Sequence, residues 1–234
     1  MLKADFHIHT REDPYDKYLI SYTAKDLIRF AAKKGFEVLS ITNHESVYFN
    51  KVIYDYAKKK GILLIPGAGA KIEGKHVLLI NITNDDLKKI KIFEDLKKLK
   101  DSALIIAPHP FFIKKSCLGI KLEKYIDYFD AVEYSHYYMK MFQNSLLRFF
   151  DRNIPAKKIA KKYKKPLVGT SDAHYFYQMN HTYSMIDSAK NKDAVIKAIK
   201  KGKVRLVTKP LTIPVFLRRT FNLFFKRVFQ QNCL

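Results

Sequence analysis

The chain has 234 residues, of which 47% are hydrophobic, so it is long enough to bury the core of one or two domains. It has no run of about 18 apolar residues, which argues against a transmembrane helix. The two cysteines, Cys117 and Cys233, form neither a CxxC pair nor a disulfide framework. No Ser-, Gly- or Pro-rich linker divides the sequence, and we expect one domain, residues 1–210, followed by a tail, residues 211–234.

The chain is strongly basic, with 44 Lys and Arg against 22 Asp and Glu, giving a net charge of +22. This charge suggests an anionic partner: a nucleic acid, an acidic membrane surface or a phosphorylated small molecule. The lysines are spread along segments such as 88–100 and 157–165, which favours solvated helix faces over a nucleic-acid groove. Because the N-terminus starts directly in a predicted strand, without a signal peptide, we expect a cytoplasmic protein.

Short apolar strands alternate with longer amphipathic helices along the chain, as in βα units. The predicted strands are 3–8, 36–42, 62–66, 76–82, 103–107, 130–134, 166–170, 183–187 and 204–208. The predicted helices are 23–35, 51–60, 85–100, 139–150, 155–164 and 191–201. This count indicates an α/β barrel of the TIM type, and a doubly wound sheet is the second possibility.

The segment 23–35 carries the clearest helix signals. Thr23 is a good N-cap, Asp26 lies in the first turn, and Gly35 suits the C-terminal end. An apolar face is formed by Leu27, Ile28 and Ala31.

Polar residues follow most of the predicted strands. They are His7 and His9, Asn43 and His44, His109, Glu133, Ser135 and His136, and Asp172 and His174. In a parallel barrel all these strand ends lie on one face, where active sites form. Six of the eight histidines would therefore meet at one mouth.

The spacing of these residues indicates metal binding. Residues i and i+2 of an extended strand point the same way, so His7 and His9 can reach one ion, and Asp172 and His174 repeat the pattern. Imidazole with carboxylate suits zinc, manganese or iron.

Other polar residues have two interpretations each. His76 begins a strand instead of ending one, so we give it a structural role. His181 either lines the rim of the site or caps a turn. Asp13 and Asp16 are either loop acids, which we favour slightly, or further ligands. The tyrosines at 134, 137 and 138 could stack on a substrate, but core and rim packing is the simpler reading.

In this order, four motifs resemble those of the PHP family (polymerase and histidinol phosphatase domain). They are residues 5–10 (DFHIHT), 41–45 (ITNHE, with Asn43 where relatives usually have Asp), 107–110 (APHP) and 169–174 (GTSDAH). The resemblance covers about residues 3–208. It implies a distorted (β/α)7 barrel, or PHP fold, that holds up to three divalent metal ions.

The resemblance also implies residue roles. His7, His9 and Asp172 would hold one ion, and His44 and His174 another, together with an acid from the 11–16 loop. His109 would hold a third, helped by His136 or by Glu133.

Position 69 departs from the family pattern. Relatives have a PGxE motif whose Glu bridges two metals, and aligning Pro66 and Gly67 places Gly69 there. Glu73 lies in 72–75 (IEGK), which is typical of a hairpin turn, and we expect it to point to solvent. Three outcomes are open: a weaker but working cluster, partial metal occupancy, or a non-catalytic binder.

The first functional hypothesis is metal-dependent phosphoester hydrolysis, in which His181 or His136 protonates the leaving oxygen. The alternative is a non-catalytic or weakened PHP module that binds a phosphorylated ligand or nucleic acid. The chain has neither a GxxxxGK[ST] loop nor a GxSxG elbow.

The tail has the pattern of a basic amphipathic helix. Its apolar face would comprise Leu217, Phe221, Phe224, Phe225 and Val228, beside Arg218, Arg219, Lys226 and Arg227. We favour packing on the domain or dimerisation over an anionic membrane surface.

Overall fold

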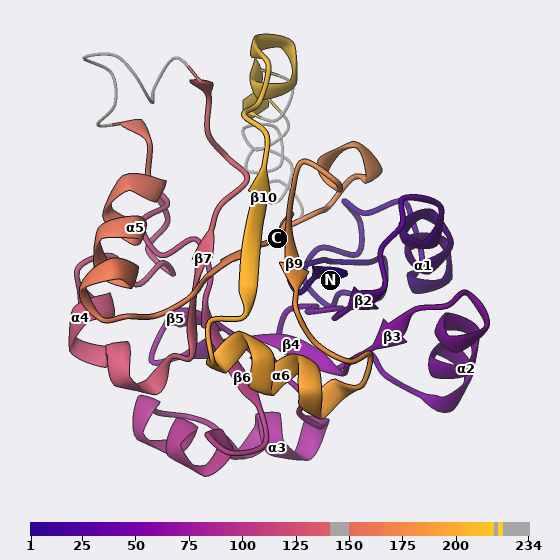
Figure 1. The fold of residues 1–234 in the computed structure, drawn as a ribbon, viewed down its shortest axis with the longest axis horizontal. Helices are drawn as coiled ribbons and strands as arrows, with labels where there is room; N and C mark the ends of the chain where they lie inside the picture. The colour runs from indigo at the N-terminus through magenta and orange to yellow at the C-terminus, as the bar shows by residue number, and fades with distance from the viewer. Residues whose placement is uncertain (141–149, 218–219, 222–234) are drawn as a thin grey trace.

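The computed structural model describes residues 1–140, 150–217 and 220–221. Its strands form two five-stranded sheets (Figure 1). The first sheet has the order β10 (Val204–Thr208), β9 (Thr182–Ile186), β1 (Leu2–Asp5), β2 (Val38–Leu39) and β3 (Leu63–Leu64). The second has the order β4 (Gly67–Ile72), β5 (Lys75–Ile80), β6 (Leu104–Ala107), β7 (Ala131–Tyr134) and β8 (Leu167–Gly169).

Helices surround the strands (Figure 1). They are α1 (Ala24–Lys33), α2 (Lys51–Lys59), α3 (Asn84–Lys89), α4 (Lys121–Tyr125), α5 (Asn153–Lys162) and α6 (Lys192–Lys200), with the 3-10 turns η1 (Phe93–Leu99), η2 (Ile126–Tyr128) and η5 (Phe176–Gln178). The predicted start of α1 is confirmed: Thr23 and Asp26 form a reciprocal capping box, which satisfies free N–H groups of the first turn.

The predicted closed barrel is replaced by this pair of mixed sheets. Among the described residues no continuous ladder joins them into one ring. At one edge Gly69 N donates to Asn43 O at 3.0 Å, and His44 forms an isolated bridge with Gly69. At the other edge the Ser184 hydroxyl bonds both the N–H and the C=O of Gly169 at 3.0 Å. The sheets therefore meet through single contacts.

The β4–β5 hairpin explains much of the departure from a parallel barrel. Residues 67–72 lie between two predicted strands, but they form a strand of their own, β4, antiparallel to β5. The turn is at Glu73 and Gly74, whose positive φ angles of 45° and 76° suit a tight hairpin. β5 is also antiparallel to β6. The start of β5 therefore lies beside the end of β6.

The core follows the two-residue period of the strands. Leu78 and Ile80 pack in a cluster that contains residues of both sheets and of α6. Val77 and Leu79, on the other face of β5, join a second cluster under η1 and α5. A third cluster lies between the first sheet, α1 and α2. His76 is thus in register with the face that the two sheets share.

Most of the tail and of the predicted helix 139–150 lies outside the described residues. In the described part, Leu211 forms a bridge with Met139, and the Phe216 ring lies 5.1 Å from that of Tyr137. The helical face, the domain boundary at 210 and the role of the tail stay predictions. Within the described ranges, no helix has the length and apolar character needed to span a membrane.

Candidate metal centre

Five histidines and two aspartates lie close together at one edge of the sheets. Three groups have ligand atoms within 4.8 Å of one another: His7, His76 and His109; His7, His9 and Asp172; and His9, Asp13 and His44. The predicted convergence of His7, His9, His44, His109 and Asp172 is therefore observed. The two residues that link the groups, His7 and His9, follow β1 directly.

Asp172 faces both histidines of the HxH motif. Its Oδ1 lies 3.3 Å from His7 Nε2 and 3.4 Å from His9 Nε2. Both histidines are fully buried. Asp172 is partly buried, which acts to raise its carboxyl pKa, but the facing imidazoles hold that pKa well below the usual range. A permanent negative charge therefore sits between two ring nitrogens.

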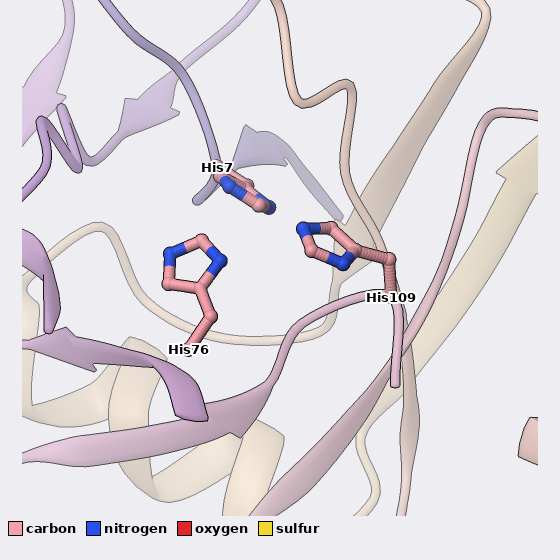
Figure 2. A group of neighbouring side chains, drawn as sticks. All are labelled: His7, His76 and His109. Atoms are coloured by element: carbon pink, nitrogen blue, oxygen red, sulfur yellow. The ribbon is translucent and has the colours of Figure 1, made fainter. Parts of the chain in front are cut away.

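His76 and His109 join His7 from the other side. The three ring centroids lie 5.4 Å apart in each pairing, and Figure 2 shows the imidazoles around a common space. His109 follows β6, and His76 is the second residue of β5. Because these two strands are antiparallel, the start of one and the end of the other bring both rings to the same edge.

Of the two interpretations of Asp13, its place beside two histidines favours a role in the centre. Its Oδ2 accepts hydrogen bonds from Nδ1 of His9 and Nδ1 of His44, both at 2.9 Å, and from the His44 N–H at 2.8 Å. Asp16 likewise lies 3.0 Å from Nε2 of His174. The loop therefore supplies two carboxylates that orient three predicted ligand histidines.

Two further contacts fix the rings of the His7–His76–His109 group. Nδ1 of His7 lies 2.8 Å from Oε2 of Glu133, and both side chains are fully buried. Nδ1 of His109 lies 3.3 Å from Sγ of Cys117, whose thiol pKa burial raises to about 11. A thiol that stays protonated can hold His109 without competing for a metal.

Burial sets the protonation of these groups. It lowers the pKa of His7 to about 3 and that of His76 well below the usual range. It raises the pKa of Glu133 to about 7. Burial also acts to lower the pKa of His9, but the carboxylates of Asp13 and Asp172 outweigh this effect and raise that pKa to about 9. The His7–His76–His109 side is therefore neutral, and the His9–Asp13 side is ionic.

The backbone is constrained at two of the strand-end positions. His109 and Asp172 have positive φ angles of 25° and 45°. Non-glycine residues rarely adopt this conformation, which costs on the order of 1–3 kcal/mol and is typical of functional sites. The fold thus holds two candidate ligands in unfavourable backbone conformations.

The residues present fit a divalent cation. Within the described residues, Nε2 of His7, His9 and His76 is buried with no hydrogen-bond partner. A buried nitrogen without a partner costs about 1–3 kcal/mol, and such atoms beside an anionic carboxylate match a metal's ligand set. His7, with its Nδ1 engaged by Glu133, offers one nitrogen, so it can serve only one ion at a time.

Besides His174, which pairs with Asp16, two predicted residues lie outside the three groups. His136 follows β7 and is buried, and its carbonyl accepts from Tyr138 N at 3.2 Å. His181 precedes β9, and its carbonyl accepts from Lys209 N at 2.8 Å. Their assignments as a metal ligand and a catalytic acid stay predictions.

The place of His76 in the centre was not predicted from the sequence. Nor was the contact of Glu133 with His7 predicted. Glu133 could have been found, since carboxylates that orient ligand histidines are common. His76 could not, because its position depends on the direction of β5. Glu73 is exposed and accepts a hydrogen bond from Phe93 N at 3.2 Å, away from the centre, as expected.

Comparisons with known proteins find similar sequences. A family model described as PHP-associated matches residues 151–204, which include Asp172 and His174. The uncharacterized protein MJ1587 of Methanocaldococcus jannaschii is 26% identical over 128 residues, or 52% of this chain and 75% of the relative.

Solved structures share the fold. PsfC from Pseudomonas syringae matches with a TM-score of 0.58 and 13% identity over 100% of this chain and 99% of its own. A proposed metal-dependent phosphoesterase from Bifidobacterium adolescentis matches with a TM-score of 0.52 and 14% identity over 74% and 87%. An amidohydrolase from Chromobacterium violaceum, solved with sulfate and no metal, gives 0.51 and 12% over 73% and 87%. The family model matches residues 151–204 alone, and at 12–14% identity the solved structures show a shared fold.

Proposed function

We propose that this protein is a metal-dependent phosphoesterase. The observation that carries the proposal is a set of buried Nε2 atoms without a hydrogen-bond partner. Those of His7 and His9 face the Asp172 carboxylate, and that of His76 belongs to the adjoining His7–His76–His109 group. The PHP-type fold and a neighbour proposed to be a metal-dependent phosphoesterase support the same reaction class.

Different residues would bind the metal ions, orient the ligand histidines and donate a proton. His7, His9, His76, His109 and Asp172 would hold divalent ions. When bound, such ions polarise phosphate oxygens and lower the pKa of a coordinated water towards about 7. Asp13 and Glu133 keep the rings aimed at the centre through their Nδ1 atoms. His181 or His136 would give a proton to the leaving oxygen.

The substrate would be a phosphorylated small molecule or a nucleotide. The net charge of +22 favours the arrival of anions, and burial of the centre favours a small ester that can enter it. Nucleic acid, or a membrane surface contacted by the tail, remains a second class of partner. A non-catalytic phosphate-binding module is the alternative outcome of the test.

The experiment is a phosphatase and phosphodiesterase assay on chelator-treated protein reloaded with zinc, manganese or iron. Small aryl phosphates and nucleotides are the substrates, and Asp172→Asn is the matched variant. We expect metal-dependent turnover that Asp172→Asn lowers by at least about 100-fold. Metal loading without turnover on any ester, combined with phosphate binding, would establish the non-catalytic alternative instead.

A further inference from the structure

The His76 imidazole fills the space beside Gly69 where a side chain at position 69 would lie. A Cβ built on Gly69 would lie 2.7 Å from Nε2 of His76, closer than real Cβ atoms approach another heavy atom. The φ angle of Gly69 is not positive, so backbone conformation does not demand glycine here. Glycine fits here because the His76 imidazole takes the space that a Cβ would need.

The strand register places His76 there. In the β4–β5 hairpin Gly69 is opposite Leu78, and His76 is two residues earlier on the same face. His76 N donates to Ser116 O at 2.7 Å, which anchors its backbone. The ring then reaches diagonally across β4 towards His7 and His109.

We propose that His76 is a metal ligand, that His7, His76 and His109 form an all-imidazole site, and that Gly69 is the positioning residue that admits His76. This inference deepens the proposed function by assigning one site of the centre, and it rests on that function only through the need for a metal. Gly69 then marks a different ligand set and not the loss of one.

The ligand set determines which ions the site prefers. Three imidazoles bring no negative charge and one lone pair each, so no ligand of this site can bridge two ions. Imidazole suits zinc, copper, iron and nickel, whereas manganese and magnesium prefer oxygen ligands. We therefore expect this site to bind zinc well and manganese poorly.

The test measures metal binding and does not depend on turnover. Chelator-treated full-length protein is titrated calorimetrically with zinc and with manganese, and cobalt absorption reports the ligand field. The variants are His76→Ala, which removes the imidazole, and Gly69→Ala, which removes no ligand but displaces the ring. Val77→Ala and Ala70→Gly are matched controls, because both residues belong to the opposite core cluster.

We expect His76→Ala and Gly69→Ala each to weaken zinc binding by at least about 10–100-fold, while both controls leave it unchanged. The double variant Gly69→Glu/His76→Ala should regain binding with manganese favoured, because a carboxylate then takes the vacated space. Circular dichroism melting confirms that each variant is folded. Zinc affinity that His76→Ala leaves unchanged in folded protein would overturn the inference.

The two proposals fail in different ways. An active wild-type enzyme whose zinc binding does not depend on His76 would overturn this inference alone. A wild-type protein that binds zinc through His76, yet hydrolyses no phosphoester, would overturn the proposed function alone.

Discussion

Nδ1 of His7 lies 2.8 Å from Oε2 of Glu133, with both side chains fully buried. This contact leaves Nε2 as the only nitrogen that His7 can offer to the centre. Two of the three ligand groups contain His7, so they share that atom. One ion can bind His7 at a time. A second ion must bind through other residues, namely His9, Asp172, Asp13 and His44.

Glu133→Gln should lower zinc affinity by about 10–100-fold, because the amide no longer accepts a charged hydrogen bond from His7 Nδ1. Competition with a fluorescent chelator measures the change. Glu123→Gln, on an exposed acid that pairs with Lys162, is the control. Equal affinities in the two variants would show that Glu133 does not orient His7.

Zinc affinity should rise with pH by up to about tenfold per pH unit below 7 and level off above it. Burial raises the Glu133 pKa to about 7, and the protonated acid would donate to Nδ1 and leave the proton of His7 on Nε2. Calorimetric titrations at several pH values check this. The slope should flatten in Glu133→Gln, and a slope unchanged in that variant would contradict the assignment.

The raised pKa of Glu133 has the opposite effect on the stability of the metal-free protein, which falls as pH rises. The folded pKa of Glu133 lies above its value of 4.5 for an unperturbed acid, so between these values the folded state holds a proton that the unfolded state has lost. Its contribution is therefore complete below pH 4.5 and disappears as pH rises through about 7. Urea unfolding of chelator-treated wild type and Glu133→Gln would reveal it as a difference in slope.

Asp13→Asn should reduce kcat/KM on a phosphoester substrate by about 10–100-fold, since one carboxylate oxygen holds both His9 and His44. The asparagine keeps the shape but presents a weaker acceptor. Asp85→Asn, on a side chain that is 78% exposed, should leave kcat/KM unchanged. Full activity in Asp13→Asn would mean that the histidines are held by other contacts.

Phe93→Ala should lower the free energy of unfolding by about 3–5 kcal/mol, because Phe93 is fully buried and stacks on Tyr125 with ring centroids 3.9 Å apart. Zinc affinity should not change, since Phe93 belongs to the cluster on the outer face of the second sheet. Urea unfolding and zinc titration of the same sample separate the two effects. A parallel loss of zinc binding would show that this cluster supports the centre directly.

Local sequence determined the elements whose signals are local. The capping residues Thr23 and Asp26 predicted the start of α1, and the Glu-Gly pair predicted the turn at residues 72–75. The HxH of His7 and His9 and the strand-end position of His109 pointed to one centre. These inferences needed only side-chain periodicity, turn preferences and the rule that parallel strands end together.

Strand direction and cross-strand register were decided only in the tertiary structure. Residues 67–72 carry no strong apolar run and become a strand because β5 pairs with them. His76 looked structural because it begins a strand, but β5 runs antiparallel to its neighbours, so its start lies where theirs end. A hydrogen-bonded ladder between segments far apart in the chain fixes that direction, and no local pattern in the sequence encodes it.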